Sequence, residues 1–202
     1  MAKSERITHL NYNIVVMGDP YCGKSSIIER YVTGKYGPNY IQTIGSEYAK
    51  KKLEIEGNPV MLYVYDTAGQ EDMKTVIKSI YRKAQGILLV FDFSRKKTFD
   101  HIRDWIDLIQ MNCDITPEMV LVGNKVDLQH LPVTTADVEV FAESHNLPFL
   151  NVSAKRNYNI EEAFNKLSKN IFINRKRLYP CNMVTSIQLK QDQNENNNSC
   201  CS

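Results

Sequence analysis

The sequence predicts a single α/β domain built on a doubly wound, mostly parallel six-stranded sheet, with one antiparallel edge strand and helices on both faces. Three observations support this fold class. Short apolar runs alternate with segments of helical periodicity. The runs are continuously apolar, as in parallel strands that are buried on both faces. A chain of 202 residues is long enough for one well-buried domain.

The elements are expected in the following order. A first strand at 12–18, "YNIVVMG", leads into a helix at 24–32, "KSSIIERYV". Two strand-like runs, 47–57 and 58–66, follow as a hairpin around a Gly-Asn turn and supply the antiparallel edge strand. Three further strands, separated and followed by helices, are expected at "GILLVFDF", "EMVLVGNK" and "PFLNVSA".

Apolar side chains at helical spacing mark two of the later helices. They are Phe99, Ile102, Trp105, Ile106 and Ile109, and then Ile160, Ala163, Phe164, Leu167 and Ile171. We interpret Trp105 as a packing residue only. Thr134 and Asp137 form a capping pair that opens the helix between them.

The domain is expected to span residues 10–178, after a short extension at 1–9. Residues 179–202 are polar, Asn-rich and almost without apolar periodicity, so we expect a disordered tail. No apolar run reaches 18 residues, and the N-terminus lacks the apolar core of a signal peptide, which predicts a cytosolic chain.

Charge and cysteine content exclude other classes of protein. The 25 basic and 23 acidic residues leave a net charge of +2, which argues against a nucleic-acid partner. Cys22, Cys113 and Cys181 show neither metal-ligand nor redox spacing, so free thiols are expected. We also expect a monomer.

A phosphate-binding loop is predicted at "GDPYCGKS", where a glycine, four variable residues and Gly-Lys-Ser join a strand to a helix. Glycines let the backbone approach phosphate, helix-start amides point at it, and the lysine adds positive charge. The pattern alone fits NTPases and small-molecule kinases and leaves the base open. The candidate nucleotide-binding residues here are Gly18, Tyr21, Cys22, Gly23, Lys24, Ser25 and Ser26.

Two later segments favour guanine as the base. "NKVD" contains Asn124, Lys125 and Asp127, and "SAK" is Ser153, Ala154 and Lys155. Both follow predicted strands and should lie on the same edge of the sheet as the phosphate loop. The Asp127 carboxylate can accept hydrogen bonds from guanine N1 and its 2-amino group, whereas adenine would leave it unpaired. Alone, "NKVD" would read equally well as an exposed turn.

Residues for hydrolysis are expected between these motifs. In "YDTAGQE", Asp66 can hold a Mg²⁺-bound water, the Gly69 amide can contact the γ-phosphate, and Gln70 can orient the attacking water. Thr43 and Ser25 would ligate Mg²⁺. Loops held only while the γ-phosphate is present would be released by hydrolysis, which makes the reaction a timer for a change of shape.

The sequence resembles the Ras-superfamily small GTPases, and most closely the Rab branch. The similarity covers residues from about 11 to 178 and includes, in family order, "GDPYCGKS", Thr43, "DTAGQ", "NKVD" and "SAK". It implies a P-loop G domain that binds GTP, GDP and Mg²⁺ and hydrolyses GTP slowly. It also implies that Tyr36 stacks beside guanine, that Lys125 and Lys155 pack around it, and that the Ala154 amide meets its O6 atom.

The resemblance further implies the partners of a vesicle-trafficking switch: an exchange factor, a GTPase-activating protein, a GDP-dissociation inhibitor and effectors. Rab effectors read an aromatic surface, which here corresponds to Tyr48, Tyr65 and Tyr81. Pro20 departs from the family, because relatives carry a small residue there and proline has no N–H. The Tyr21 amide is therefore the one expected at the β–γ bridging oxygen. Alternatives are another Ras-superfamily branch, or a GTP-binding module with little or no hydrolysis.

The chain ends in "SCCS", with Cys200 and Cys201 adjacent. This is not a CaaX box, and it resembles the double geranylgeranylation signal of Rabs. Two lipid chains would give stable attachment to the cytoplasmic face of an intracellular membrane, with cycling through the cytosol. The alternative is a pair of unmodified thiols. Three basic residues at 175–177 suit the helix dipole at least as well as anionic lipid.

Overall fold

The computed structural model describes residues 10–37, 48–67, 82–113 and 115–178. Its strands are β1 (Leu10–Met17), β2 (Tyr48–Ile55), β3 (Asn58–Asp66), β4 (Gly86–Asp92), β5 (Glu118–Asn124) and β6 (Phe149–Asn151). Its helices are α1 (Lys24–Thr33), α3 (Lys96–Asp100), α4 (Ile102–Asn112), α5 (Thr135–Ser144) and α6 (Ile160–Leu178). The alternation predicted from the sequence is confirmed.

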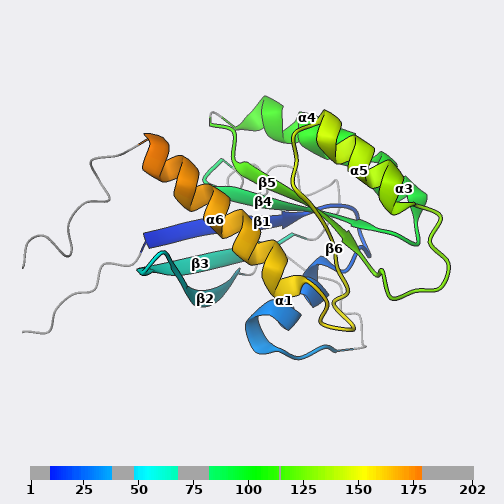
Figure 1. Cartoon of the computed structure of the whole chain (residues 1–202), viewed down its shortest axis with the longest axis horizontal. Helices are drawn as coiled ribbons and strands as arrows, with labels where there is room; N and C mark the ends of the chain where they lie inside the picture. The colour runs from blue at the N-terminus through cyan, green and yellow to red at the C-terminus, as the bar shows by residue number, and fades with distance from the viewer. Residues whose placement is uncertain (1–9, 38–47, 68–81, 114, 179–202) are drawn as a thin grey trace, which may run out of the picture.

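The strands form one six-stranded sheet in the order β2-β3-β1-β4-β5-β6. All neighbouring pairs are parallel except β2 and β3, so the expected antiparallel edge strand is β2. The carboxyl ends of the parallel strands consequently lie at one edge of the sheet, as Figure 1 shows. In such sheets, this edge is where ligands bind.

Two apolar clusters cover the two faces of the sheet. Alternation along β1 assigns Ile14 and Val16 to the cluster with α1 and α6, and Val15 and Met17 to the cluster with α4 and α5. Figure 1 shows α6 crossing one face of the sheet, with α3, α4 and α5 grouped away from it. The central strand β4 is buried along its whole length, which explains its uninterrupted apolar sequence.

Two local expectations need correction. The β2–β3 hairpin turns at Glu56 and Gly57 rather than at a Gly-Asn pair, because Asn58 already pairs with Ile55 in the sheet. Both turn residues adopt positive φ, +49° and +74°. Positive φ at both central residues is typical of the tight hairpin turn that matches strand twist. The expected single helix around Trp105 is divided into α3 and α4 at His101, whose ψ of −7° departs from helical geometry.

The N-cap of α5 forms as predicted. The Thr134 side chain accepts a hydrogen bond from the Asp137 backbone N–H at 3.2 Å, and its hydroxyl lies 2.6 Å from the Asp137 carboxylate. The expected extension at 1–9 and the expected tail at 179–202 lie outside the described residues.

Candidate functional site

The loop between β1 and α1 requires glycine at both ends of its motif. Gly18 has a φ of +141°, and a Cβ there would lie 2.0 Å from the Val90 carbonyl oxygen. Gly23 has a φ of +88°, and its Cβ would lie 2.5 Å from the Asn124 side-chain nitrogen. Backbone conformation and close approach therefore both exclude larger residues at these positions. The glycines predicted for a phosphate loop have a structural reason in this chain.

Lys24, the lysine of the motif, is buried and folds back over the loop. Its Nζ donates to the carbonyl oxygens of Gly18 at 2.9 Å and Asp19 at 2.8 Å. Burial lowers the pKa of Lys24, and the acidic groups nearby, Asp66 among them, oppose that shift. A buried ammonium group bonded to neutral carbonyls is a strong electrostatic partner for an anion.

The next three carbonyls of the loop are each held by a side chain from outside it. The contacts are Arg95 Nη2 to Pro20 O at 2.6 Å, Lys125 Nζ to Tyr21 O at 2.8 Å, and Asn124 Nδ2 to Cys22 O at 2.8 Å. Together with the two Lys24 contacts, five consecutive carbonyl oxygens have side-chain donors. Because each N–H points away from the carbonyl of its own trans peptide, these donors orient the loop amides, except at the Asp19–Pro20 peptide, which has no N–H.

A buried carboxylate, Asp92, anchors two of those donors. Its Oδ2 atom lies 2.6 Å from Lys125 Nζ and 3.2 Å from Arg95 Nε, and its Oδ1 accepts from the Ser94 N–H at 2.9 Å and hydroxyl at 2.6 Å. Burial alone would raise the pKa of Asp92, but the hydrogen bonds from Lys125 and Ser94 outweigh it and lower that pKa. Sequence reasoning missed Asp92 and Arg95. The sequence feature that could have revealed them is a pair of charged residues at the end of a buried strand, at the edge of the sheet where ligands bind.

A cavity of about 190 Å³ adjoins the phosphate loop and brings together most of the residues predicted to bind the base. Its lining is Gly23, Ser26, Tyr36, Asn124, Lys125, Asp127, Leu128, Ala154 and Lys155. The three motifs are far apart in sequence and meet here because β5 and β6 end beside the start of α1. Leu128 is an additional lining residue that no motif predicted.

Hydrogen bonds pre-position the acidic residue of this cavity. The Ser153 hydroxyl donates to Asp127 Oδ1 at 2.5 Å and itself accepts from the Arg156 backbone N–H at 2.9 Å. Asn124 joins the loops from the other side, because its Oδ1 accepts from the Ala154 N–H at 3.3 Å. Asn124 and Ser153 therefore link the predicted site residues to one another.

Arg30 of α1 also supports the cavity, and sequence reasoning missed it. Its Nε donates to Ala154 O at 2.9 Å and its Nη2 to Lys155 O at 3.3 Å. The same guanidinium lies 5.6 Å from the centre of the Tyr36 ring. A half-buried arginine in a helix gave no specific signal, since the sequence of the helix does not reveal a partner 124 residues away.

The predicted magnesium and catalytic residues are only partly described. Asp66 ends β3 and pairs in register with Val16 of β1, which places it beside the start of the phosphate loop. Ser25 lies in the first turn of α1. The hydroxyl and carboxylate oxygens of these two residues suit Mg²⁺. Thr43, Gly69 and Gln70 lie outside the described residues.

Trp105 does more than pack. Its Nε1–H donates to Asp19 Oδ1 at 2.9 Å, while the other oxygen of Asp19 lies 2.7 Å from His101 Nδ1. The prediction that Trp105 serves packing alone is therefore wrong, because its indole N–H donates a hydrogen bond to Asp19.

Part of the predicted effector surface is visible on β2 and β3. Tyr48 is 54% exposed, and its ring centre lies 5.6 Å from that of Tyr65 and 6.0 Å from that of Tyr63. Tyr63, which lies on β3 with Tyr65, thus adds one residue to this aromatic surface. Tyr81 lies outside the described residues.

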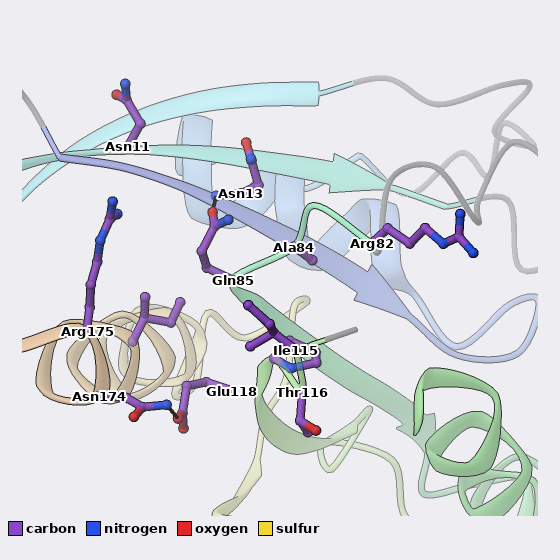
Figure 2. Close-up of a pocket in the computed structure, with 12 residues that line it drawn as sticks. Asn11, Asn13, Arg82, Ala84, Gln85, Ile115, Thr116, Glu118, Asn174 and Arg175 are labelled. Atoms are coloured by element: carbon purple, nitrogen blue, oxygen red, sulfur yellow. Dashed lines mark hydrogen bonds between the residues drawn. The ribbon is translucent and has the colours of Figure 1, made fainter. Parts of the chain in front are cut away.

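A larger cavity, about 510 Å³, lies at the opposite edge of the sheet, by the starts of β1, β4 and β5 (Figure 2). In Figure 2 the Asn174 amide of α6 meets the Glu118 carboxylate, at 2.8 Å. Gln85 accepts a hydrogen bond from the Asn13 backbone N–H at 2.7 Å. None of the predicted site residues lines this cavity, so its size does not make it the functional site.

Within the described residues, Cys22 and Cys113 are outside any disulfide, as expected, whereas Cys181, Cys200 and Cys201 lie beyond them. No helix in the described part of the chain combines the length and apolar character needed to cross a membrane.

A loop with the phosphate-binding motif, next to a cavity lined by the residues predicted to bind guanine, lies at the carboxyl edge of this sheet, and this arrangement is typical of P-loop GTPases. The Ras family profile matches residues 13–173, and the chain belongs to that family. It is 34% identical to the Ras-related protein Rab-13 of Rattus norvegicus over 192 residues, 94% of this chain and 95% of the relative.

Two further relatives show a similar level of sequence identity. The GTP-binding protein YPTM1 of Zea mays is 37% identical over 158 residues, 78% of this chain and 76% of the relative. The Ras-related protein SEC4 of Saccharomyces cerevisiae is 37% identical over 156 residues, 77% of this chain and 73% of the relative. The expected resemblance is confirmed: the chain is a Rab-like small GTPase, an enzyme that hydrolyses GTP.

Proposed function

We propose that this chain is a Rab-type switch that binds GTP and GDP at the carboxyl edge of its sheet and hydrolyses GTP slowly. The observation that carries the proposal is the row of five phosphate-loop carbonyls held by side chains beside the base cavity. Such a row directs backbone amides toward a phosphate group. Lys24 adds charge that a β or γ oxygen can neutralise.

Guanine selectivity rests on Asp127. Its carboxylate accepts from guanine N1 and the 2-amino group, and Ser153 keeps that carboxylate in one orientation. Lys125, Lys155 and the ring of Tyr36 pack around the base. The Ala154 amide, now bonded to Asn124 at 3.3 Å, would turn to the base O6 when guanine is present.

Ser25, Thr43 and Asp66 would hold Mg²⁺, directly or through water. The bound ion would neutralise charge on the β- and γ-phosphates. Gln70 orients the attacking water, and the Gly69 amide holds the γ-phosphate. Thr43 and Gly69 lose their partner on hydrolysis, so the segments that carry them change shape with the nucleotide.

The Rab assignment extends to membranes and partners. Attachment of two geranylgeranyl groups at Cys200 and Cys201 would hold the protein on the cytoplasmic face of an intracellular membrane. The GTP form would recruit vesicle-trafficking effectors through Tyr48, Tyr65 and Tyr81. An exchange factor, an activating protein and a GDP-dissociation inhibitor would complete the cycle.

The test is single-turnover hydrolysis of preloaded GTP by the purified chain with Mg²⁺, beside its Gln70→Leu variant. We expect slow hydrolysis by the wild type and at least a ten-fold loss in the variant, because leucine cannot orient water. A Gln191→Leu variant, changed in the tail, is the control. Equal rates for the wild type and Gln70→Leu would remove Gln70 from the mechanism.

A further inference from the structure

Tyr21 occupies a backbone conformation that does not suit it. Its φ is +67°, in the left-handed region that a bulky residue rarely adopts. A non-glycine residue is strained in this conformation and persists there only with support from the surrounding structure. Tyr21 is 56% exposed, so burial of its ring is not the main support. Something else must hold this turn.

The support comes from both peptide groups that flank the Tyr21 Cα atom. Arg95 Nη2 holds the Pro20 carbonyl at 2.6 Å, on the φ side of Tyr21. Lys125 Nζ holds the Tyr21 carbonyl at 2.8 Å, on the ψ side. Both cations also contact Asp92, so one buried carboxylate fixes the two donors relative to each other. The two peptide planes, and with them both dihedral angles of Tyr21, are held in place.

Arg95 is suited to this task by its planar, forked shape. While Nε faces Asp92 at 3.2 Å, Nη2 reaches Pro20 O and lies 3.8 Å from the Cys22 sulfur. Its Cζ atom is also 6.0 Å from the centre of the Tyr21 ring. Lys125 bridges Asp92 and the loop with one nitrogen, whereas Arg95 uses two nitrogens of one rigid plane, which fixes the direction from the carboxylate to Pro20 O.

The orientation of this peptide bears directly on phosphate binding. Among the described residues, no peptide bond is cis, so the Tyr21 N–H points away from the Pro20 carbonyl that Arg95 holds. Pro20 has no N–H of its own, which leaves the Tyr21 amide as the donor expected at the β–γ bridging oxygen.

We propose that Arg95 is a positioning residue for the nucleotide: it holds the left-handed turn at Tyr21 and thereby aims the Tyr21 amide at the phosphates. The inference rests on the proposed nucleotide site. Arg95 lies outside the motifs that predicted this site, and it acts through the loop rather than by contact with the ligand.

The first experiment measures release of a fluorescent GDP analogue and single-turnover GTP hydrolysis, using the full chain and its Arg95→Ala variant. Loss of a charge-assisted hydrogen bond should speed release about ten-fold and slow hydrolysis. Lys96→Ala removes the same charge from the neighbouring exposed residue and should change neither rate. Equal release from Arg95→Ala and the wild type would overturn the inference.

A rescue experiment separates positioning from general structural support. Glycine adopts positive φ without strain, so Tyr21→Gly should make the support from Arg95 largely unnecessary. In the Tyr21→Gly background, Arg95→Ala should speed GDP release only about two-fold, a clear departure from additivity. The same ten-fold effect in both backgrounds would overturn the positioning role.

The Tyr21→Gly/Arg95→Ala double variant also tests the inference when Arg95→Ala alone does not fold. If Arg95→Ala is unfolded, a folded and nucleotide-binding Tyr21→Gly/Arg95→Ala double variant supports the inference, and an unfolded double variant overturns it. Arg95→Lys should fall between the wild type and Arg95→Ala. Failure of the wild type to bind GDP would overturn the proposed function and this inference with it. Tight wild-type binding with unchanged release from Arg95→Ala would overturn the inference alone.

Discussion

Trp105 of α4 donates its indole N–H to the carboxylate of Asp19 in the phosphate loop, at 2.9 Å. The two residues are 86 positions apart in the chain. Trp105 packs against the apolar cluster with α4 and α5, and the bond ties this cluster to the loop proposed to hold phosphate. The position of α4 and the shape of the loop are therefore coupled.

Trp105→Phe should weaken this coupling while keeping an aromatic ring in the cluster. Loss of the hydrogen bond should lower the free energy of unfolding by about 1–2 kcal/mol and speed GDP release a few-fold. Urea denaturation followed by circular dichroism and a nucleotide-release assay measure the two effects. Phe141→Leu, in the same cluster but away from the loop, should reduce stability without changing release. Equal release rates in the two variants would contradict the coupling.

Asp92→Asn should destabilise the protein in a pH-dependent way. Removing the buried carboxylate leaves Arg95 and Lys125 without their shared partner. We expect the free energy of unfolding to fall by about 2–3 kcal/mol. This is near the low end for buried ion pairs because both cations are partly exposed. The folded pKa of Asp92 lies below its ordinary value of 3.8. Its contribution is therefore complete above roughly pH 4 and is lost as the pH falls through the lowered folded pKa.

Urea denaturation of the wild type and Asp92→Asn across pH measures this difference in unfolding free energy. We expect a constant difference from about pH 5 to 8 that narrows below pH 4. A difference that stays the same into strong acid would show that the carboxylate charge is not the cause.

Gly18→Ala should abolish GDP binding and lower the free energy of unfolding by about 3 kcal/mol or more, because its methyl group would meet the Val90 carbonyl. Gly34→Ala is the matched control. Gly34 also has positive φ, +71°, but a Cβ there would meet nothing within 4 Å, so only backbone strain of about 1 kcal/mol is expected. Thermal unfolding and the nucleotide content of the purified proteins distinguish the two. Similar losses in both variants would rule out the clash with Val90.

Ser153→Ala should reduce guanine recognition by releasing Asp127. We expect about a ten-fold loss in GDP affinity, and a smaller loss for inosine diphosphate, which lacks the 2-amino group that Asp127 accepts from. Titration calorimetry with both nucleotides measures the difference. Ser144→Ala, at the exposed end of α5, should leave both affinities unchanged. Equal losses for the two nucleotides would argue against orientation of Asp127 by Ser153.

The succession of strands and helices along the chain could be predicted because apolar runs and helical periodicity are local signals. The hairpin turn could not be placed to the residue, because Glu56 adopts positive φ in a conformation that glutamate does not favour by itself. The gap between α3 and α4 was also missed. His101 continues the helical spacing in sequence, and its altered ψ is visible only in the structure.

The sequence by itself determined which segments are proposed to bind phosphate and base, because each is a short run with a characteristic spacing and the runs occur together in a recognisable order. Only the tertiary structure revealed what holds them. Arg95 reaches Pro20 across 75 positions, and Arg30 reaches Ala154 across 124. Such pairs leave no periodicity or spacing in the chain, since they form only when the parallel strands bring their carboxyl ends to one edge of the sheet.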